Sequence, residues 1–217
     1  MADEWYRSSD WNRRVEDDFE RRLSRASPSN KPQYLRIKAL ALLEAGGRKK
    51  CLAARDLLQR VLREYPDSID VVNAHEALGE FYESDGAFDD AEAHYRAALH
   101  LSLEGNVHGD AHLRLPELLI RSGQAGKLAD ANAILGTIDL ERDLAFTSQR
   151  FRYAVCRARL AAARDNPEEA SDYAVEALRL AAITRPDFPR HPTVGRVDAE
   201  EGLLREMQHL AADERPR

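Results

Sequence analysis

Small and apolar residues recur along this chain at intervals of four and then three positions, in four separate places. The sets are Ala54, Leu58 and Val61; Ala91, Tyr95 and Ala98; Ala131, Leu135 and Ile138; and Ala170, Ala174 and Ala177. Residues with this spacing lie on one face of an α-helix, and small residues there let a second helix approach closely. No alternating run of β-branched residues appears, so almost no strand is expected. The pattern predicts an all-α protein.

The stretch from Val72 to Gly105 carries the fullest motif. It reads His75-x-x-Leu78-Gly79-x-x-Tyr82, then Gly86-Ala87-Phe88-Asp89-Asp90-Ala91, then Tyr95 and Ala98. This spacing resembles the tetratricopeptide repeat (TPR), a helical hairpin of about 34 residues with the pattern W-x2-L-G-x2-Y, A-x3-F and P. His75 stands at the tryptophan position and Leu103 at the proline position. The resemblance implies a right-handed α-solenoid of about four TPR-like helical hairpins, with flanking helices at both ends.

Weaker copies of the motif extend the array over residues 33–184. The expected repeats are 33–68, 72–105, 112–140 and 148–184. The third copy repeats the turn of the strong unit as Gly126-Lys127-Leu128-Ala129-Asp130-Ala131. Pro116 interrupts its front helix, because an interior proline removes a hydrogen bond. We therefore expect this helix to start late, with Pro116 in its first turn, or to bend.

Residues 1–32 and 185–217 flank the array. The cluster Ser8-Ser9-Asp10 is rich in helix-capping side chains, and it precedes apolar residues at helical spacing. This predicts a capping helix from about Asp10 to Arg25. The proline-rich stretch 185–192 breaks the array, and residues 194–211 form an amphipathic pattern. A closing helix is expected there, because a terminal repeat would otherwise expose an apolar flank.

Three large aromatic residues, Trp5, Tyr6 and Trp11, crowd the start of the chain. Two interpretations stay open. The three side chains pack locally against the first repeat, or they form a patch for self-association or for a partner.

Composition and charge exclude several classes of function. The net charge is −6, the two signs are interspersed, and the densest basic run, Arg48-Lys49-Lys50, is too short for a nucleic-acid surface. No apolar stretch approaches the roughly 20 residues of a membrane helix. The first residues lack the basic and apolar parts of a signal peptide. We expect a cytoplasmic protein without nucleic-acid or membrane partners, with Cys51 and Cys156 unpaired.

No motif for catalysis, metal or cofactor binding emerges. His108 and His112 have helical spacing, but the glutamate of a zinc-hydrolase helix is missing, and glycines place His108 in a loop. Paired carboxylates such as Glu168-Glu169 start helices, where the helix dipole stabilises them. Phosphate-loop, dinucleotide and nucleophile-elbow motifs are absent from the sequence. We predict no catalytic residues, no metal and no cofactor, and therefore a protein that is not an enzyme.

The TPR resemblance also implies where a partner would bind. In that family the first helix of each repeat lines a concave groove and holds the ligand by fixed positions. In the strong repeat these positions carry Asn73, Glu76, Glu80, Glu83 and Ser84, and in the outer repeats they include Arg36, Arg152 and Arg159. The three glutamates also share one helix face by spacing alone. They form either an acidic platform for a basic segment or a solvated face.

The leading prediction is a non-catalytic adaptor that binds a peptide or protein segment, basic or of mixed charge, in the concave groove. One alternative is a peptide-sensing regulatory subunit that acts through a separate effector protein. Another is a self-assembling structural protein that uses Trp5, Tyr6 and Trp11. The sequence leaves the partner and the oligomeric state open.

Overall fold

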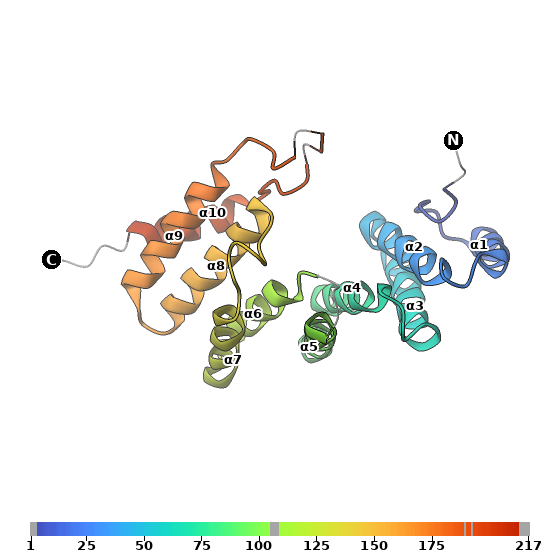
Figure 1. Cartoon of the computed structure of the whole chain (residues 1–217), viewed down its shortest axis with the longest axis horizontal. Helices are drawn as coiled ribbons and strands as arrows, with labels where there is room; N and C mark the ends of the chain where they lie inside the picture. Colours follow the sequence, from blue (N-terminus) through green and yellow to red (C-terminus); the bar gives the residue numbers. More distant parts are fainter. Residues whose placement is uncertain (1–3, 105–108, 189, 192, 213–217) are drawn as a thin grey trace. The chain divides into compact units, whose positions relative to one another are not determined.

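The computed structural model describes residues 4–104, 109–188, 190–191 and 193–212. Within these ranges the chain forms ten α-helices and no strand, and one β-bridge joins Phe188 to His191. The predicted all-α class is confirmed. The helices of Figure 1 are α1 (Arg13–Arg25), α2 (Lys31–Ala45), α3 (Arg48–Glu64), α4 (Asp70–Ser84), α5 (Phe88–Glu104), α6 (Ala111–Arg121), α7 (Ala125–Gly136), α8 (Thr147–Ala163), α9 (Pro167–Ala181) and α10 (Glu201–Ala212).

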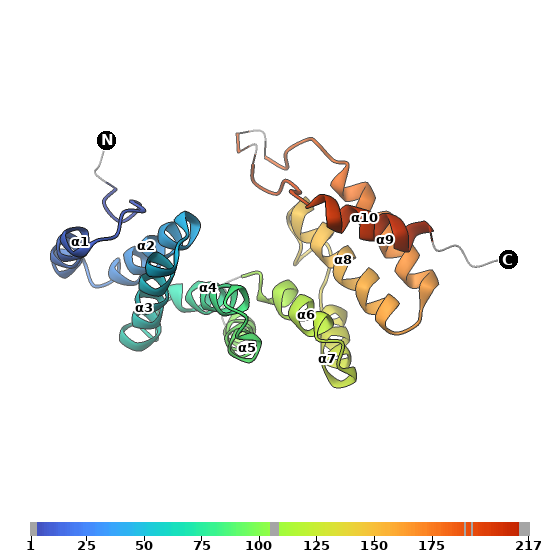
Figure 2. The same ribbon diagram turned by 180° about the vertical axis from the view of Figure 1, so that it is seen from behind.

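The chain divides into two compact units, the N-terminal unit (Met1–Ala111) and the C-terminal unit (His112–Arg217). Within each unit, helices that follow one another in sequence pack together. The pairs α2–α3, α3–α4 and α4–α5 do so in the first unit, and α7–α8, α8–α9 and α9–α10 in the second. Figure 2 shows the last three helices of the C-terminal unit as one packed group.

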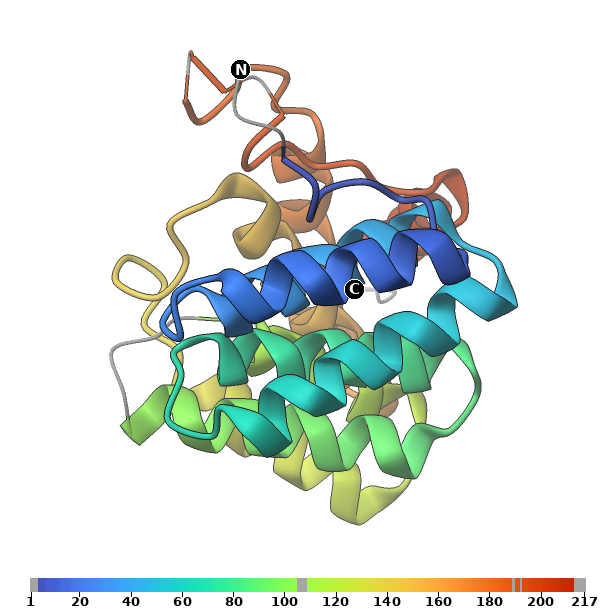
Figure 3. The same ribbon diagram turned by 90° about the vertical axis from the view of Figure 1, so that its right-hand side faces the viewer.

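Helix α1 lies beside the first hairpin of the N-terminal unit (Figure 3). Its two buried residues, Phe19 and Leu23, share a core cluster with residues of α2 and α3. The helix begins at Arg13 because the side chain of Asn12 accepts a hydrogen bond of 3.1 Å from the Val15 N–H. The expected cap at Ser8-Ser9-Asp10 is therefore wrong, and those residues belong to the preceding segment.

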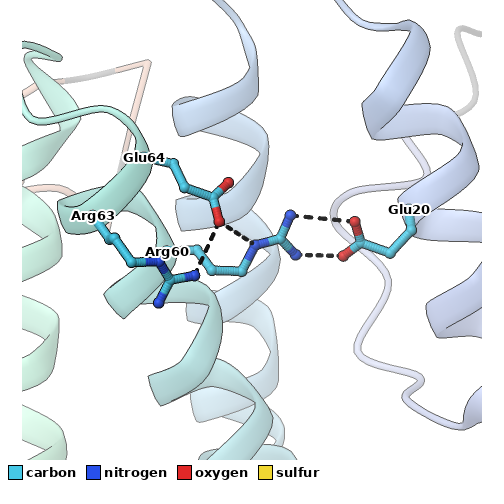
Figure 4. A network of polar contacts seen from close by, with 4 residues as sticks. All are labelled: Glu20, Arg60, Arg63 and Glu64. Atoms are coloured by element: carbon cyan, nitrogen blue, oxygen red, sulfur yellow. Dashed lines mark hydrogen bonds and ion pairs between the residues drawn. The ribbon is translucent and has the colours of Figure 1, made fainter.

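A network of charged side chains also joins α1 to α3 (Figure 4). Arg60 donates to both carboxylate oxygens of Glu20, at 2.5 and 3.3 Å. Glu64 lies on the other side of the guanidinium, 3.4 Å from its Nε, and also pairs with Arg63 at 3.0 Å. Because these groups are partly exposed, the contacts between them add little stability.

The packing of α4 against α5 explains why the motif has a glycine at position 79. Tyr95 and its neighbours Ala91 and Ala98 are completely buried. The ring of Tyr95 lies against Gly79, where an added Cβ would come within 2.4 Å of its Cε1 atom. Only glycine fits there, so the ring and the glycine are matched.

In the C-terminal unit, α8 and α9 meet through small residues. Ala158, Ala174 and Ala177 are fully buried, and Met207 of α10 closes the same core. Pro116 lies inside α6, beyond the first turn of a helix that begins at Ala111, so its predicted first-turn placement is wrong.

Helix α10 begins at Glu201, later than the expected start near Val194. Gly195 takes a positive φ of 77°, which ends a turn, and residues 196–200 have no regular secondary structure. None of the described helices combines the length and the apolar composition that a membrane crossing requires.

Candidate functional site

Glu76, the centre of the predicted acidic face, is turned inward to the start of α6. Its Oε1 accepts a hydrogen bond of 2.6 Å from the Ala111 N–H. Gly109 passes so close that a Cβ there would lie 2.2 Å from the same oxygen. Burial raises the pKa of Glu76 to about 7, and the carboxylate of Asp110 adds to the rise, while backbone hydrogen bonds oppose it. Glu76 therefore serves as an internal cap.

The other predicted groove residues of α4 are placed differently from one another. Glu83 is half-buried and accepts a hydrogen bond of 2.9 Å from the Tyr95 hydroxyl. Asn73 is half-buried, and Glu80 and Ser84 are exposed. The three glutamates share a helix, but at least Glu76 and Glu83 contact groups of the protein itself. They do not present three equivalent carboxylates to a partner.

All three predicted arginines lie within ion-pair distance of a carboxylate of the protein itself, and the pairs of Arg36 and Arg159 are the closest. The Arg36 Nε lies 2.6 Å from Oδ1 of the buried Asp70. Arg159 makes a bidentate pair with Glu206 of α10, with both N–O distances at 2.7 Å. A bidentate pair is among the stronger ionic contacts. Arg159 thus fastens α10 to α8.

The aromatic residues at the start of the chain pack within the N-terminal unit. The ring of Trp5 lies 5.1 Å from that of Phe19, and Tyr6 stacks on Tyr34 at 4.6 Å. Trp11 contacts Phe19 and also the ammonium of Lys38, which lies 5.3 Å from its ring. The three aromatic residues therefore pack locally, which was one of the two interpretations of the sequence. Self-association stays a prediction.

Lys38 is a buried charge that no sequence pattern signalled. Its side chain is 0% exposed, and its Nζ donates to the backbone carbonyls of Ser8 at 2.5 Å and Asp10 at 3.1 Å. Burial lowers the pKa of this ammonium. The two carbonyls and the Trp11 ring replace its water, so Lys38 ties the first segment to α2.

A second unpredicted polar pair joins α4 to α5. The Nδ1 atoms of His75 and His94 are 2.9 Å apart. Their ring centroids are 5.1 Å apart, close to the largest separation that such an N–N contact allows, so the two nitrogens point at each other. This end-on geometry fits a hydrogen bond between neutral rings and not a shared metal. Burial lowers the pKa of His75 to about 4 and lowers that of His94 as well.

The remaining candidate residues are the two histidines near the start of α6 and the two cysteines. His112 lies half-buried on α6, and His108 is outside the described residues. Within the part of the chain that the structure describes, no group of three or more His, Cys, Asp or Glu side chains could hold a metal ion. Both cysteines are unpaired, and complete burial raises the pKa of the Cys156 thiol to about 12. That thiol is protonated and shielded at neutral pH.

The third predicted arginine, Arg152, lines a cleft in the C-terminal unit. The cleft encloses about 360 Å³ between α6, α8 and the segment that leads into α10. Its lining residues are Arg114, Glu117, Ser148, Phe151, Arg152, Val155, Arg196, Val197, Asp198, Ala199, Glu200 and Leu203. Phe151 and Val155 form an apolar wall, and charged groups stand around it. This volume lies at the lower end of the range for ligand sites in proteins.

The cleft carries both signs of charge. Three arginines and three acidic residues line it, and the pair Arg152–Glu117 is 4.0 Å apart, the outer limit of an ion pair. Such a surface matches a ligand of mixed charge better than a uniformly charged one.

One wall of the cleft comes from a segment that contacts fix in place. Asp187 accepts hydrogen bonds from the Thr147 N–H at 2.8 Å and from its hydroxyl at 2.6 Å, which caps α8. The Ser148 N–H donates to the Gly195 carbonyl at 2.9 Å. The sequence predicted a proline-rich break over residues 185–192 and a helix from about Val194, so residues 196–200 were expected to be helical. The alternation of charged and apolar residues from 196 to 200 was the signal that could have marked this segment.

Comparison with known proteins finds no matching family model, no matching curated protein and no matching solved structure.

Proposed function

We propose that this chain is a non-catalytic interaction module of the TPR type, a right-handed solenoid of helical hairpins that binds a peptide segment of a partner protein. The packing of consecutive helices within each unit supports this assignment. The fit of Gly79 against Tyr95 supports it further, because it gives the motif's glycine on the first helix and aromatic residue on the second helix a packing role.

The observation that carries the binding proposal is the cleft around Arg152. It combines an apolar wall from Phe151 and Val155 with arginines from α6 and α8. Peptide sites use such apolar surfaces for affinity and a few polar groups for orientation. A volume of about 360 Å³ takes a few side chains of a loop or terminus, and not the flat face of a globular domain.

The balanced charge of the cleft defines the ligand. An acidic side chain of the peptide pairs with Arg152 or Arg114, and a basic one pairs with Asp198 or Glu200. An apolar residue between them lies on Phe151. The partner is therefore a segment of mixed charge around an apolar residue, within the class expected from the sequence.

Selection of peptides tests the proposal. A random twelve-residue display library is selected on the full-length protein, and the affinity of the tightest peptide is measured by fluorescence anisotropy. Exchanging charge at two cleft positions, Arg152→Glu with Arg196→Glu, should weaken binding by about tenfold or more, since each lost charged contact contributes about 1.5–3 kcal/mol.

The matched control is Arg164→Glu with Arg185→Glu, which makes the same charge change at two exposed arginines outside the cleft lining. This control should keep the affinity of the unaltered protein. Equal weakening by both double variants would show a general charge effect and reject the cleft as the site, as would a selection that yields no specific peptide.

A further inference from the structure

The segment Arg196–Glu200 forms one side of the cleft. All five of its residues line the cleft, one after another. Their side chains nevertheless alternate, with Arg196, Asp198 and Glu200 exposed and Val197 and Ala199 half-buried. Alternation is the mark of extended backbone, whose successive side chains point to opposite sides. The backbone is the edge that residues of both kinds share, so we infer that the backbone of the segment borders the cleft.

The backbone N–H and C=O groups of this segment can form hydrogen bonds with a ligand. Among the residues that the structure describes, none makes a hydrogen bond with the backbone of Val197, Asp198 or Ala199. Backbone N–H and C=O groups bordering an apolar wall gain from a partner, because water reaches them less well there. An extended edge with unpaired groups is the usual template for adding another strand.

Both ends of the segment are held in place. The Gly195 carbonyl accepts from Ser148 on α8, and the Glu200 carbonyl accepts from the Leu204 N–H at 3.1 Å in the first turn of α10. Gly195 also passes so close to Asp187 that a Cβ would lie 1.8 Å from Oδ2. The edge is therefore ordered before a ligand arrives, which lowers the entropic cost of pairing with it.

We propose that the peptide ligand binds in extended form and pairs its backbone with Val197–Ala199, as an added strand between this segment and helices α6 and α8. This inference rests on the proposed function and specifies its ligand. Alternate ligand residues face Phe151, Val155 and the two helix arginines, and the intervening residues face solvent. The cleft therefore contacts every second side chain of an extended ligand segment.

A scan of the selected display peptide with N-methyl groups tests the pairing on the unaltered protein. In a strand pair, every second ligand N–H donates to the neighbouring backbone. Methylation at alternate positions should therefore weaken binding by about tenfold, and methylation between them should change it little. A three-to-four-residue period, typical of a helical ligand, or a flat profile would overturn the extended mode.

Variants of the segment give an independent test. Ala199→Pro removes one backbone N–H and should reduce the affinity for the same peptide about tenfold, while Ala199→Ser keeps that N–H and should bind normally. Circular dichroism checks that both variants are folded. Equal affinity of the two would also overturn the pairing. A peptide that needs Arg152 but shows no alternation would reject only the extended mode, whereas a failed selection would reject the proposed function itself.

Discussion

The two units pack their central hairpins by different means. In the N-terminal unit, Gly79 makes room for the buried ring of Tyr95, whereas in the C-terminal unit Ala158 and Ala174 stand at the corresponding spacing, both fully buried. A glycine on one helix facing an aromatic ring on the other fills the helix interface to native density. Alanines on both helices are a second way to fill it. The hairpin requires a matched pair of positions, and neither residue alone is essential.

The units also differ in what they bury. The N-terminal unit encloses three ionisable residues, Lys38, His75 and Glu76, each with its pKa shifted by burial. The core shared by α8, α9 and α10 is apolar, and the charged pair Arg159–Glu206 lies at its margin. Stability of the first unit should therefore depend on pH and on single polar groups. The second unit combines an apolar core with the charged cleft.

The largest effect is expected when the matched pair Gly79 and Tyr95 of the N-terminal unit is disrupted. Gly79→Ala should lower the free energy of unfolding by about 2–3 kcal/mol, because the buried ring cannot move away from the new methyl group. Urea unfolding followed by tryptophan emission measures this unit, since Trp5 and Trp11 are the only tryptophans of the chain. Gly202→Ala in α10 is the control for the gain in helix propensity, as a Cβ there meets nothing within 4 Å, and urea unfolding followed by circular dichroism should find it neutral or stabilising.

The same pair allows a sharper comparison. Gly79→Ala combined with Tyr95→Ala reproduces the alanine pair of the C-terminal unit. The double variant should lose less stability than the sum of the single losses, because the methyl group no longer meets a ring. Strict additivity would contradict the idea that the two positions are matched.

Lys38→Met should cost the N-terminal unit about 2 kcal/mol. Methionine fills a similar volume but leaves the Ser8 and Asp10 carbonyls without their charged donor. Freed from Lys38, the segment that holds Trp5 should become sensitive to limited proteolysis before the helices do. Cleavage at the same rate as in the unaltered protein would show that aromatic packing alone holds the segment.

The pH dependence should show two opposed trends. The pKa of His75, about 4 when folded against 6.5 ordinarily, makes stability fall as pH drops from about 6.5 to 4. The pKa of Glu76, about 7 against 4.5 ordinarily, makes stability fall as pH rises from about 4.5 to 7. In the unaltered protein these contributions partly cancel.

Glu76→Gln removes one of the two trends. When the pH is lowered from 7 to 5, protonation of Glu76 stabilises the unaltered protein, and the variant lacks this gain. The free energy of unfolding of the variant, relative to that of the unaltered protein, should therefore fall by about 1–2 kcal/mol over this range, after allowance for partial exposure. Urea unfolding at both pH values, followed by tryptophan emission, measures the difference. Parallel pH curves for the two proteins would mean that Glu76 does not titrate in this range.

The smallest effect concerns the C-terminal unit. Ala158→Gly should cost about 1 kcal/mol, the difference in helix propensity with a small cavity added. Hydrogen exchange of α8 and α9 amides would record it. A loss as large as that of Gly79→Ala would remove the contrast between the two hairpins.

The helices themselves followed from the sequence to a large extent. The predicted small-residue sets include Ala91, Tyr95 and Ala98, which are all buried. Helix ends were less predictable, because they depend on single side chains: Asn12 starts α1, and Gly195 ends a turn ahead of α10. Spacing carries no information on which of several polar residues turns back to cap a helix.

The candidate site was predictable only in part. Arg152 was expected at a binding surface and lines the cleft, but Arg114 and the segment Arg196–Glu200 were not expected there. The cleft brings together residues from positions 114 to 203, and no local pattern links them. The segment was overlooked because Val197, Leu203 and Leu204 have helical spacing, which predicted one helix over residues 194–211.

What the sequence determined by itself is the all-helical character of the chain and the faces on which its small residues lie, since both follow from local spacing and propensity. The tertiary structure decided what each charged residue does. Glu76 caps α6 through Ala111, and Arg159 holds α10 through Glu206, so neither acts as an open contact point. Such roles depend on partners far away along the chain and on burial, and both exist only once the helices have packed.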